Sequence, residues 1–159
     1  MAKSSWKYFE RRIAKKIADL WGLKYNENIL RTPGSGSMSN FKGDIIVIGE
    51  NFPLHIECKF GYEFNLEDII KNKASIKSFV KQAEDDSPED KIPVVILSRP
   101  YYGVYVIIDR KHVLLTNFWA NNIATKLMFY MITENYLVIS VDDLKIVFDG
   151  GVFSGKRTV

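Results

Sequence analysis

Residues 43–60, GDIIVIGENFPLHIECKF, carry the patterns that are most informative about the fold of this chain. Their first part, residues 43–49, is a continuous apolar run between two glycines, which predicts a strand buried on both faces. Residues 50–53 then predict the turn of a hairpin, and residues 54–60 return as a second strand in which apolar and polar side chains alternate. The alternation separates an apolar face from a polar face: Leu54, Ile56, Cys58 and Phe60 on one side, and His55, Glu57 and Lys59 on the other.

The polar face of this hairpin carries residues suited to phosphodiester hydrolysis. Asp44 opens the first strand, while Glu57 and Lys59, two positions apart, lie on the same side of the second. Two carboxylates can hold Mg²⁺, and a lysine beside it can orient the attacking water or neutralise the transition state. Because Asp44 and Glu57 repel each other, we expect a raised carboxylate pKa in the metal-free protein. The alternative is an exposed cross-strand ion pair, which contributes little to stability.

Helix and strand patterns continue on both sides of this stretch. The predicted elements are a helix from Ser4 or Ser5 to Leu20 or Trp21 that ends at Gly22, a short strand over 27–32, a Gly- and Ser-rich loop over 32–39, a helix over 66–84, an acidic loop over 85–90, strands over 93–98 and 104–108, an edge strand over 137–140, and a short helix over 141–146 capped by Ser140. This order predicts an α/β protein with a central mixed β-sheet flanked by helices. We expect a single domain over 1–159, with a catalytic core at about 5–110, a C-terminal strand and helix region at about 111–150, and a loose tail over 151–159.

The charge of the chain is unevenly distributed. Its net charge is +3, but residues 1–82 contain 14 Lys and Arg against 9 Asp and Glu, whereas the remainder contains 8 against 10. A basic N-terminal half is compatible with a polyanionic partner, although lysines that only solvate helix faces would give the same counts. The single cysteine, Cys58, excludes an internal disulfide framework and a multi-cysteine zinc site. No apolar stretch suits a membrane span or a signal peptide, so we expect a cytoplasmic, DNA-associated protein without a membrane partner.

Three motifs in the N-terminal half resemble one family of DNA-cleaving enzymes. They are Arg31-Thr32-Pro33-Gly34-Ser35-Gly36-Ser37, Gly43-Asp44-Ile45-Ile46 and Ile56-Glu57-Cys58-Lys59. Together they resemble the archaeal-type Holliday junction resolvases of the PD-(D/E)XK nuclease superfamily, in which a basic helix with a glutamate precedes an Arg-x-x-x-Ser-Gly-Ser loop, a Pro-Asp-Ile-Ile strand and a Glu-x-Lys strand. The resemblance covers roughly residues 5–82 and implies a restriction-endonuclease-like core. It departs from the signature at Gly43, where the family has proline.

The resemblance implies a role for each matching residue. Glu10, Asp44, Glu57 and Lys59 would be catalytic, with Asp44 and Glu57 as direct ligands of Mg²⁺ and with Mn²⁺ as a substitute ion. The Cys58 backbone carbonyl would be a further ligand, and Glu10 would lie in the inner or outer shell of the metal. Glu10 also borders the apolar stripe of its predicted helix, although a solvated glutamate paired with Arg or Lys fits the same spacing. The Cys58 side chain is expected to be a buried core thiol.

Basic and small polar residues in the same half are candidates for DNA contact. The predicted DNA-binding residues are Arg11, Arg12, Lys15, Arg31, Ser35, Ser37, Lys42, Lys81 and Gln82, with Lys16, Lys71, Lys73 and Lys77 as further candidates. Such contacts determine affinity and salt dependence rather than sequence specificity. His55 has no second histidine nearby in sequence and is expected to be structural or incidental. Core or dimer contacts, rather than base stacking, are expected of Trp6, Trp21, Phe79, Tyr101, Tyr102 and Trp119.

These expectations combine into a metal-dependent, structure-selective DNA endonuclease that resolves four-way junctions by paired nicking. Two symmetrically placed nicks need two active sites, which predicts a homodimer acting on branched or duplex DNA. The same site would serve a restriction-like, nicking or repair endonuclease, since fold and site do not determine the substrate. The alternative from another class is a DNA-binding module that keeps the nuclease fold without hydrolysis. The presence of Glu10, Asp44, Glu57 and Lys59 argues against that alternative.

Overall fold

The computed structural model describes residues 2–32, 43–48, 52–61, 64–99 and 103–154, with side chains from Trp6 onward. Helices and strands follow in the order α1 (Ala2–Trp21), β1 (Ile29–Arg31), β2 (Ile45–Val47), β3 (Leu54–Lys59), α2 (Leu66–Ile70), α3 (Ala74–Asp86), β4 (Ile92–Arg99), β5 (Gly103–Asp109), α4 (Leu115–Ala120), β6 (Tyr130–Ile132), β7 (Tyr136–Ser140) and α5 (Leu144–Asp149). Short 3₁₀ helices, η2 (Arg110–His112), η3 (Ile123–Lys126) and η4 (Val141–Asp143), connect the C-terminal elements. The loop residues Ser35, Ser37 and Lys42 lie outside the described residues.

Within the described residues, the strands form a central five-stranded sheet and a separate two-stranded one. The central sheet has the order β3-β4-β5-β7-β6, in which β3 and β4 are parallel and the other neighbours are antiparallel. The small sheet pairs β1 with β2 in antiparallel register. A mixed sheet between helices confirms the predicted α/β class and agrees with a restriction-endonuclease-like fold.

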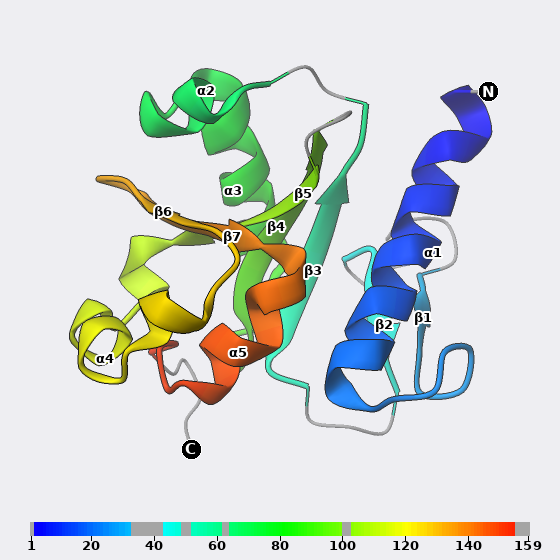
Figure 1. Cartoon of the computed structure of the whole chain (residues 1–159). Coiled ribbons are helices and arrows are strands. Elements are labelled where there is room, and N and C mark those ends of the chain that lie inside the picture. The colour runs from blue at the N-terminus through cyan, green and yellow to red at the C-terminus, as the bar shows by residue number, and fades with distance from the viewer. Residues whose placement is uncertain (1, 33–42, 49–51, 62–63, 100–102, 155–159) are drawn as a thin grey trace.

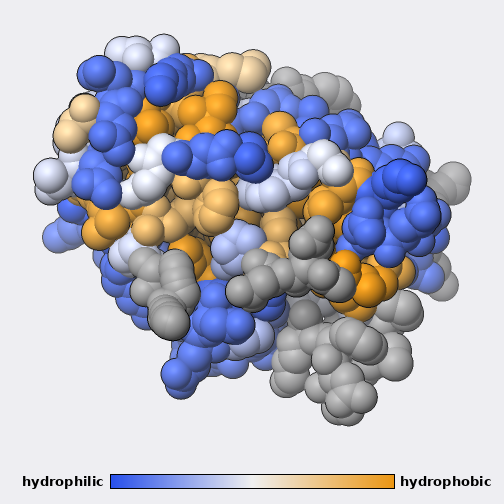
Figure 2. Space-filling view, turned by 90° about the horizontal axis from the view of Figure 1, so that it is seen from below, coloured by the Kyte–Doolittle hydropathy of each residue, from blue (hydrophilic) through white to orange (hydrophobic). Residues whose placement is uncertain are grey.

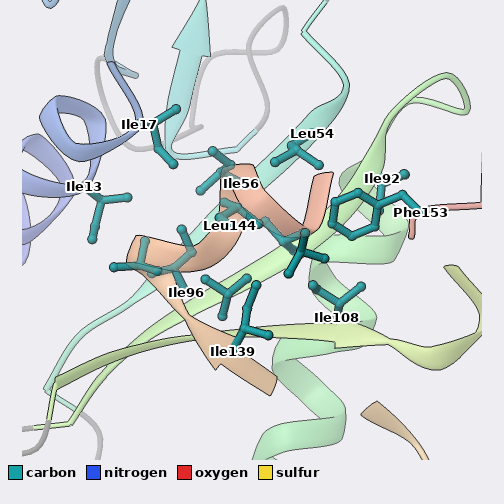
Figure 3. Packing of buried hydrophobic residues seen from close by; sticks show 14 of the residues in the cluster. Ile13, Ile17, Leu54, Ile56, Ile92, Ile96, Ile108, Ile139, Leu144 and Phe153 are labelled. Atoms are coloured by element: carbon teal, nitrogen blue, oxygen red, sulfur yellow. The ribbon is translucent and has the colours of Figure 1, made fainter. Parts of the chain in front are cut away.

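Helices cover both faces of the central sheet, as Figure 1 shows. On one face, α1 and α5 pack against the sheet, and Figure 3 shows Ile13 and Ile17 of α1 pointing toward Ile56 and Leu144. On the other face, Ile76 and Phe79 of α3 join a second buried cluster with residues of β4, β5 and β7. Because successive side chains of β3 alternate, Leu54, Ile56 and Cys58 belong to the first cluster and the residues between them face the side of α3.

Helix α1 starts earlier than its sequence predicts but ends where expected. It begins at Ala2, so Ser4 and Ser5 lie within the helix and the predicted cap at these residues is wrong. Gly22 follows the last residue with a φ of +69°, the left-handed conformation that makes glycine a good helix terminator. The helix packs beside β1 and β3, which brings its buried side, including Glu10, to the sheet edge.

The predicted hairpin between residues 43–49 and 54–60 is wrong. The first strand is only Ile45–Val47, it pairs with β1 rather than β3, and two of its three residues are partly exposed instead of buried on both faces. β3 pairs with β4 in parallel. An apolar run does not specify its partner strand, and here the partner is β1, which precedes it in the chain.

The predicted helix over 66–84 is divided into α2 and α3. Asn72, between them, has a φ of +54°, which no helix interior accepts, and its side chain accepts a hydrogen bond from the Tyr136 hydroxyl. Asn65 caps α2 in a reciprocal arrangement with Asp68, and α3 continues to Asp86, into the predicted acidic loop. The break therefore arises from tertiary contact with β7, which local periodicity does not report.

The C-terminal region contains two further departures from prediction. β7 lies between β5 and β6, so the predicted edge strand over 137–140 is an inner strand, and β6 occupies the edge. Val152 and Phe153 are buried in the first cluster, and Val113 forms a bridge with Phe153. The expected loose tail is thus wrong for these residues. Ser140 caps η4 by accepting a hydrogen bond from the Asp142 N–H, as predicted.

The described surface mixes hydrophilic and hydrophobic side chains. Figure 2 shows hydrophobic surface between hydrophilic patches on the face seen from below. Among exposed large apolar residues, Trp119 lies 6.1 Å from the ring of Tyr130, whereas Trp21 is half-buried against Phe52. Among the described helices, none has both the length and the hydropathy that crossing a membrane requires.

Candidate active site

Three hydrogen bonds hold Asp44, two from the outer edge of β3 and one from Thr32 at the end of β1. The Asp44 N–H donates to the Ile56 carbonyl at 3.0 Å, and the Asp44 carbonyl accepts from the Thr32 N–H at 2.8 Å. The Asp44 Oδ2 accepts from the Cys58 N–H at 2.7 Å. Asp44 therefore links the small sheet to the free edge of the central one, and its carboxylate lies against the backbone of the Glu57–Lys59 segment. These bonds bring Asp44 to Glu57 without the predicted hairpin ladder.

Gly43 has a structural reason to differ from the proline of the resolvase signature. Its φ is +86°, whereas the proline ring fixes φ at about −65°. A Cβ at this position would also lie 2.9 Å from Cε1 of His55 and 3.2 Å from the Ile56 carbonyl oxygen. A glycine is therefore what this approach of the chain to β3 requires.

A pocket opens where α1, β3 and α3 meet beside Asp44. Its volume is about 340 Å³, and its lining residues are Trp6, Glu10, Asp44, Glu57, Cys58, Lys59, Phe60 and Gln82. All four residues predicted to be catalytic line it. Glu10, Asp44 and Glu57 are nevertheless buried, at 4%, 7% and 4% exposed, so the pocket presents acidic groups that are largely withdrawn from water.

Gln82 of α3 holds Glu57 and Lys59 in position. Its Oε1 accepts from the Lys59 Nζ at 2.7 Å, and its Nε2 donates to the Glu57 Oε1 at 3.5 Å. The Lys59 Nζ also lies 5.2 Å from the centre of the Phe79 ring. Lys59 is only half-buried, so the ammonium is fixed at the pocket rim with access to solvent. The exposed ion pair considered as an alternative is absent at Glu57, whose carboxylate is buried.

Glu10, which lines the pocket, forms an ion pair with Arg31. The Arg31 Nε donates to the Glu10 Oε1 at 2.6 Å, and both side chains are mostly buried, at 13% and 6% exposed. The Arg31 guanidinium also lies 5.1 Å from the centre of the Trp6 ring. Trp6 precedes Glu10 by one turn of α1. An ion pair removed from water in this way positions Glu10 firmly beside the other acidic residues.

Burial and the neighbouring acidic groups raise the pKa of Asp44 from 3.8 to about 7. Burial is the largest cause, the charge of Glu57 is the next, and Glu10 adds to it. The Cys58 N–H and the Lys59 ammonium act in the opposite direction. The expected raised carboxylate pKa is therefore found at Asp44. Burial also raises the pKa of the Cys58 thiol well above its ordinary value, as suits a buried core thiol that is not a nucleophile.

Asp44 and Glu57 form the donor set that fits a divalent metal. Mg²⁺ prefers carboxylate oxygens, keeps several waters, and needs only one or two carboxylates from the protein. The N–H of Cys58 points to Asp44, and the carbonyl of the same residue in an extended strand points to the same side. Among the described residues, no three His, Cys, Asp or Glu side chains are grouped to hold a metal. The arrangement therefore fits an ion held by two carboxylates and completed by water, with Glu10 engaged by Arg31.

The predicted DNA-binding side chains occupy different environments. Arg11, Arg12 and Lys15 are exposed on α1, and Lys81 and Gln82 are exposed on α3. Lys81 pairs with Asp85 at 2.9 Å, an exposed pair of the kind that exchanges partners at little cost. Arg31 instead faces Glu10 inside the protein. The remaining candidates with acidic partners are Lys16 with Asp142, Lys71 with Glu67, and Lys73 with Asp68.

Two aromatic residues of the pocket were not predicted from the sequence as part of the site. The strand pattern predicts Phe60 on the apolar face, and core or dimer contacts are predicted for Trp6, yet both residues line the pocket. A signal for Trp6 exists, because a residue four positions before Glu10 shares its helix face. The Arg31–Glu10 pair spans 21 residues and has no comparable local signal.

Comparison with known proteins identifies the family of the chain. A family model with the description "Phage putative PDDEXK endonuclease" matches residues 2–148, which include every residue that lines the pocket. Neither the curated proteins nor the solved structures gave a match. The chain belongs to this phage PDDEXK endonuclease family, within the PD-(D/E)XK nuclease superfamily.

Proposed function

We propose that the protein is a Mg²⁺-dependent endodeoxyribonuclease that nicks four-way DNA junctions. The observation that carries the proposal is the convergence of Asp44, Glu57 and Lys59 on one pocket that Glu10 also lines. Two carboxylates beside an ammonium provide ligands for a divalent ion and a positive group for the phosphate. The family assignment supports a nuclease; the metal and the DNA structure are the further steps of the proposal.

Asp44 and Glu57 would hold Mg²⁺, or Mn²⁺ as a substitute, with the Cys58 carbonyl as a further ligand. When bound, the ion lowers the pKa of a coordinated water and screens the charge that grows on the phosphoryl oxygens. Lys59, held by Gln82, would donate from its Nζ to the attacking water or to a phosphoryl oxygen. Glu10 would act outside the inner shell, because Arg31 already binds it.

DNA would approach over the exposed basic residues of α1 and α3. Arg11, Arg12, Lys15 and Lys81 would contact phosphates, and Gln82 would add a hydrogen bond at the pocket rim. The proposal extends to Ser35, Ser37 and Lys42, which lie in the segment before Gly43. Arg31 would reach DNA only if it released Glu10, so its contribution is expected to be the smallest of the basic set.

A four-way junction is the substrate that the sequence motifs favour. Residues 31–37, followed by the Asp44 and Glu57–Lys59 motifs, are similar to the corresponding segments of junction resolvases. Productive resolution needs two symmetric nicks, so we further propose a homodimer with one site in each subunit. A branched substrate recognised by shape and phosphate contacts also suits a chain whose basic residues are concentrated in its first half.

The test is a comparison of DNA substrates of matched sequence. The protein is incubated with a four-way junction, a flap, a nicked duplex and a linear duplex, each with Mg²⁺, Mn²⁺ or EDTA. We expect paired nicks in the junction with either metal and no cleavage in EDTA. Preferential cutting of the linear duplex would contradict junction specificity and favour a restriction-like enzyme. Binding without cleavage under every condition would contradict the nuclease proposal itself.

A further inference from the structure

His55 is a buried residue that the proposed chemistry does not use. It lies on the same face of β3 as Glu57, two positions earlier, and is 5% exposed. Its ring is packed against Gly43, where even a single added Cβ would come within 2.9 Å of Cε1. The ring is therefore held in place by the backbone of the segment that carries Asp44.

The Nε2 atom of His55 is a buried polar atom without a hydrogen-bond partner in the structure. The Glu57 Oε2 lies 3.4 Å from this nitrogen. Buried polar atoms in native proteins are nearly always satisfied, so an unsatisfied nitrogen this close to a carboxylate calls for a reason. A small movement of the Glu57 side chain would shorten this contact into an ordinary hydrogen bond.

The other oxygen of Glu57 has a partner on the opposite side. Its Oε1 accepts from the Gln82 Nε2 at 3.5 Å, which is also a long contact. The carboxylate thus lies between the Gln82 amide nitrogen at 3.5 Å and the His55 Nε2 at 3.4 Å. Partners of this kind behind a metal-binding carboxylate fix its orientation and commonly change metal affinity by about 10- to 100-fold.

We propose that His55 is a positioning residue that donates a hydrogen bond from Nε2 to Glu57 and orients this carboxylate toward the divalent ion. His55 is not among the described residues that line the pocket, so it acts through Glu57 and not on DNA. Gly43 belongs to the same device, because a larger residue there would displace the ring. The inference rests on the proposed metal-dependent function and adds a residue that neither the sequence motifs nor the family assignment provides.

The first test measures metal binding without DNA. Mn²⁺ is titrated calorimetrically into the wild-type protein and into the His55→Leu, His55→Gln and Asp44→Asn variants. We expect His55→Leu to weaken Mn²⁺ binding by about tenfold, while His55→Gln, which retains a side-chain N–H donor, stays within about threefold of wild type. Equal affinity of His55→Leu and wild type, or no recovery in His55→Gln, would overturn the proposal.

The second buried histidine supplies a matched control. His112 is 4% exposed and contacts Glu84 at 3.1 Å, in η2 and outside the pocket lining. His112→Leu should lower the melting temperature while leaving the Mn²⁺ affinity unchanged. A comparable loss of affinity in this variant would mean that the His55 effect is a general consequence of removing a buried histidine, and would overturn the positioning role.

The wild-type protein gives an independent readout if His55→Leu does not fold. Nitrogen NMR of the metal-free protein at about pH 8, where an ordinary histidine is neutral, identifies which ring nitrogen carries the proton. We expect the His55 proton on Nε2; a bare Nε2 would overturn the proposal. The Mn²⁺ titration separates failure of the proposed function from failure of this inference. Wild-type protein that binds no Mn²⁺ would contradict both the metal-dependent function and the role of His55. Loss of binding in Asp44→Asn but not in His55→Leu would contradict the role of His55 alone.

Discussion

The charged Asp44 carboxylate is unfavourable in the folded protein when no metal is bound. Its burial beside Glu57 disfavours the charged form, while the Cys58 N–H only partly compensates. A divalent ion would remove this repulsion by binding both carboxylates. The same feature that makes the charged residue unfavourable without metal would therefore favour the binding of a divalent ion by Asp44.

This environment predicts a pH dependence of stability in EDTA. The pKa of Asp44 is raised from 3.8 to about 7. Between these two pH values the folded state therefore keeps a proton that the unfolded state has already lost. The resulting stabilisation is fully present below pH 3.8 and is lost as the pH rises through about 7. Asp44→Asn removes this contribution and should raise the melting temperature by a few degrees at about pH 8, but much less at about pH 5.

Calorimetry of the metal-free wild type and variant at both pH values checks this prediction. Asp149→Asn is the matched control, because Asp149 is an exposed residue paired with Lys145 on α5. The difference in melting temperature between Asp149→Asn and wild type should be the same at both pH values. A melting temperature of Asp44→Asn that parallels wild type throughout would contradict the assigned pKa.

Lys59 provides a second prediction for a single side chain. Lys59→Met removes the ammonium but keeps an unbranched chain of similar length over the Phe79 ring. Since the positive group is most valuable in the transition state, we expect cleavage to slow by about 10²- to 10³-fold with little change in DNA affinity. Single-turnover cleavage and equilibrium binding separate the two effects. A variant that binds DNA weakly but cleaves bound DNA at the wild-type rate would show that Lys59 is only a phosphate contact.

Among the elements, the sequence predicts strand β3 but not the strand with which it pairs. The alternation of residues 54–60 identified the strand and placed Glu57 and Lys59 together, because side-chain direction in a strand depends only on parity. The partner strands depend on contacts far along the chain. Asp44 consequently reaches β3 through two hydrogen bonds at the sheet edge, to Ile56 and Cys58, rather than through the expected hairpin.

The break between α2 and α3 illustrates the same limit. The apolar spacing of residues 66–84 suits one continuous helix, yet Asn72 adopts a left-handed conformation and bonds to Tyr136 in β7. Likewise, the Arg31–Glu10 pair joins residues 21 positions apart, and no local pattern connects them. The sequence thus predicted four residues that the structure brings to one pocket, whereas the contacts that support them depend on tertiary structure.

The conformation of Asn72 leads to a prediction for this element. Asn72→Val should destabilise the protein by about 1–3 kcal/mol, because a β-branched residue is strained at positive φ and the Tyr136 hydroxyl loses its acceptor. Asn72→Gly keeps the backbone conformation and loses only the acceptor, so its loss should be smaller. Urea unfolding of both variants compares the free energies of unfolding. Equal losses would contradict the assigned backbone strain.

At the scale of the whole molecule, the C-terminal segment completes the core of the nuclease fold. Val152 and Phe153 pack in the cluster that contains residues of α1, β3 and α5, although a Gly- and Ser-containing tail gave no sign of this in the sequence. Buried residues after the last helix close the end of the sheet, and the bridge from Val113 to Phe153 fixes them there.

This packing predicts that the segment is needed for stability. Phe153→Ala should lower the free energy of unfolding by about 3–5 kcal/mol, as expected for removing a buried ring. Ser154→Ala, at the neighbouring half-buried position, should cost far less. Denaturant titration measures both. A Phe153→Ala protein as stable as wild type would restore the interpretation of residues 151–154 as a loose tail.

Asp44 and Glu57 together are proposed to make the chain a metal-dependent nuclease. Single-turnover rates of junction cleavage in Mg²⁺ test this role for wild type, Asp44→Asn, Glu57→Gln and the Asp149→Asn control. We expect wild type and Asp149→Asn to cleave equally, and both site variants to lose at least about 10³-fold in rate while binding the junction nearly as well. Wild-type rates in either site variant, or cleavage by wild type that persists in EDTA, would contradict the account.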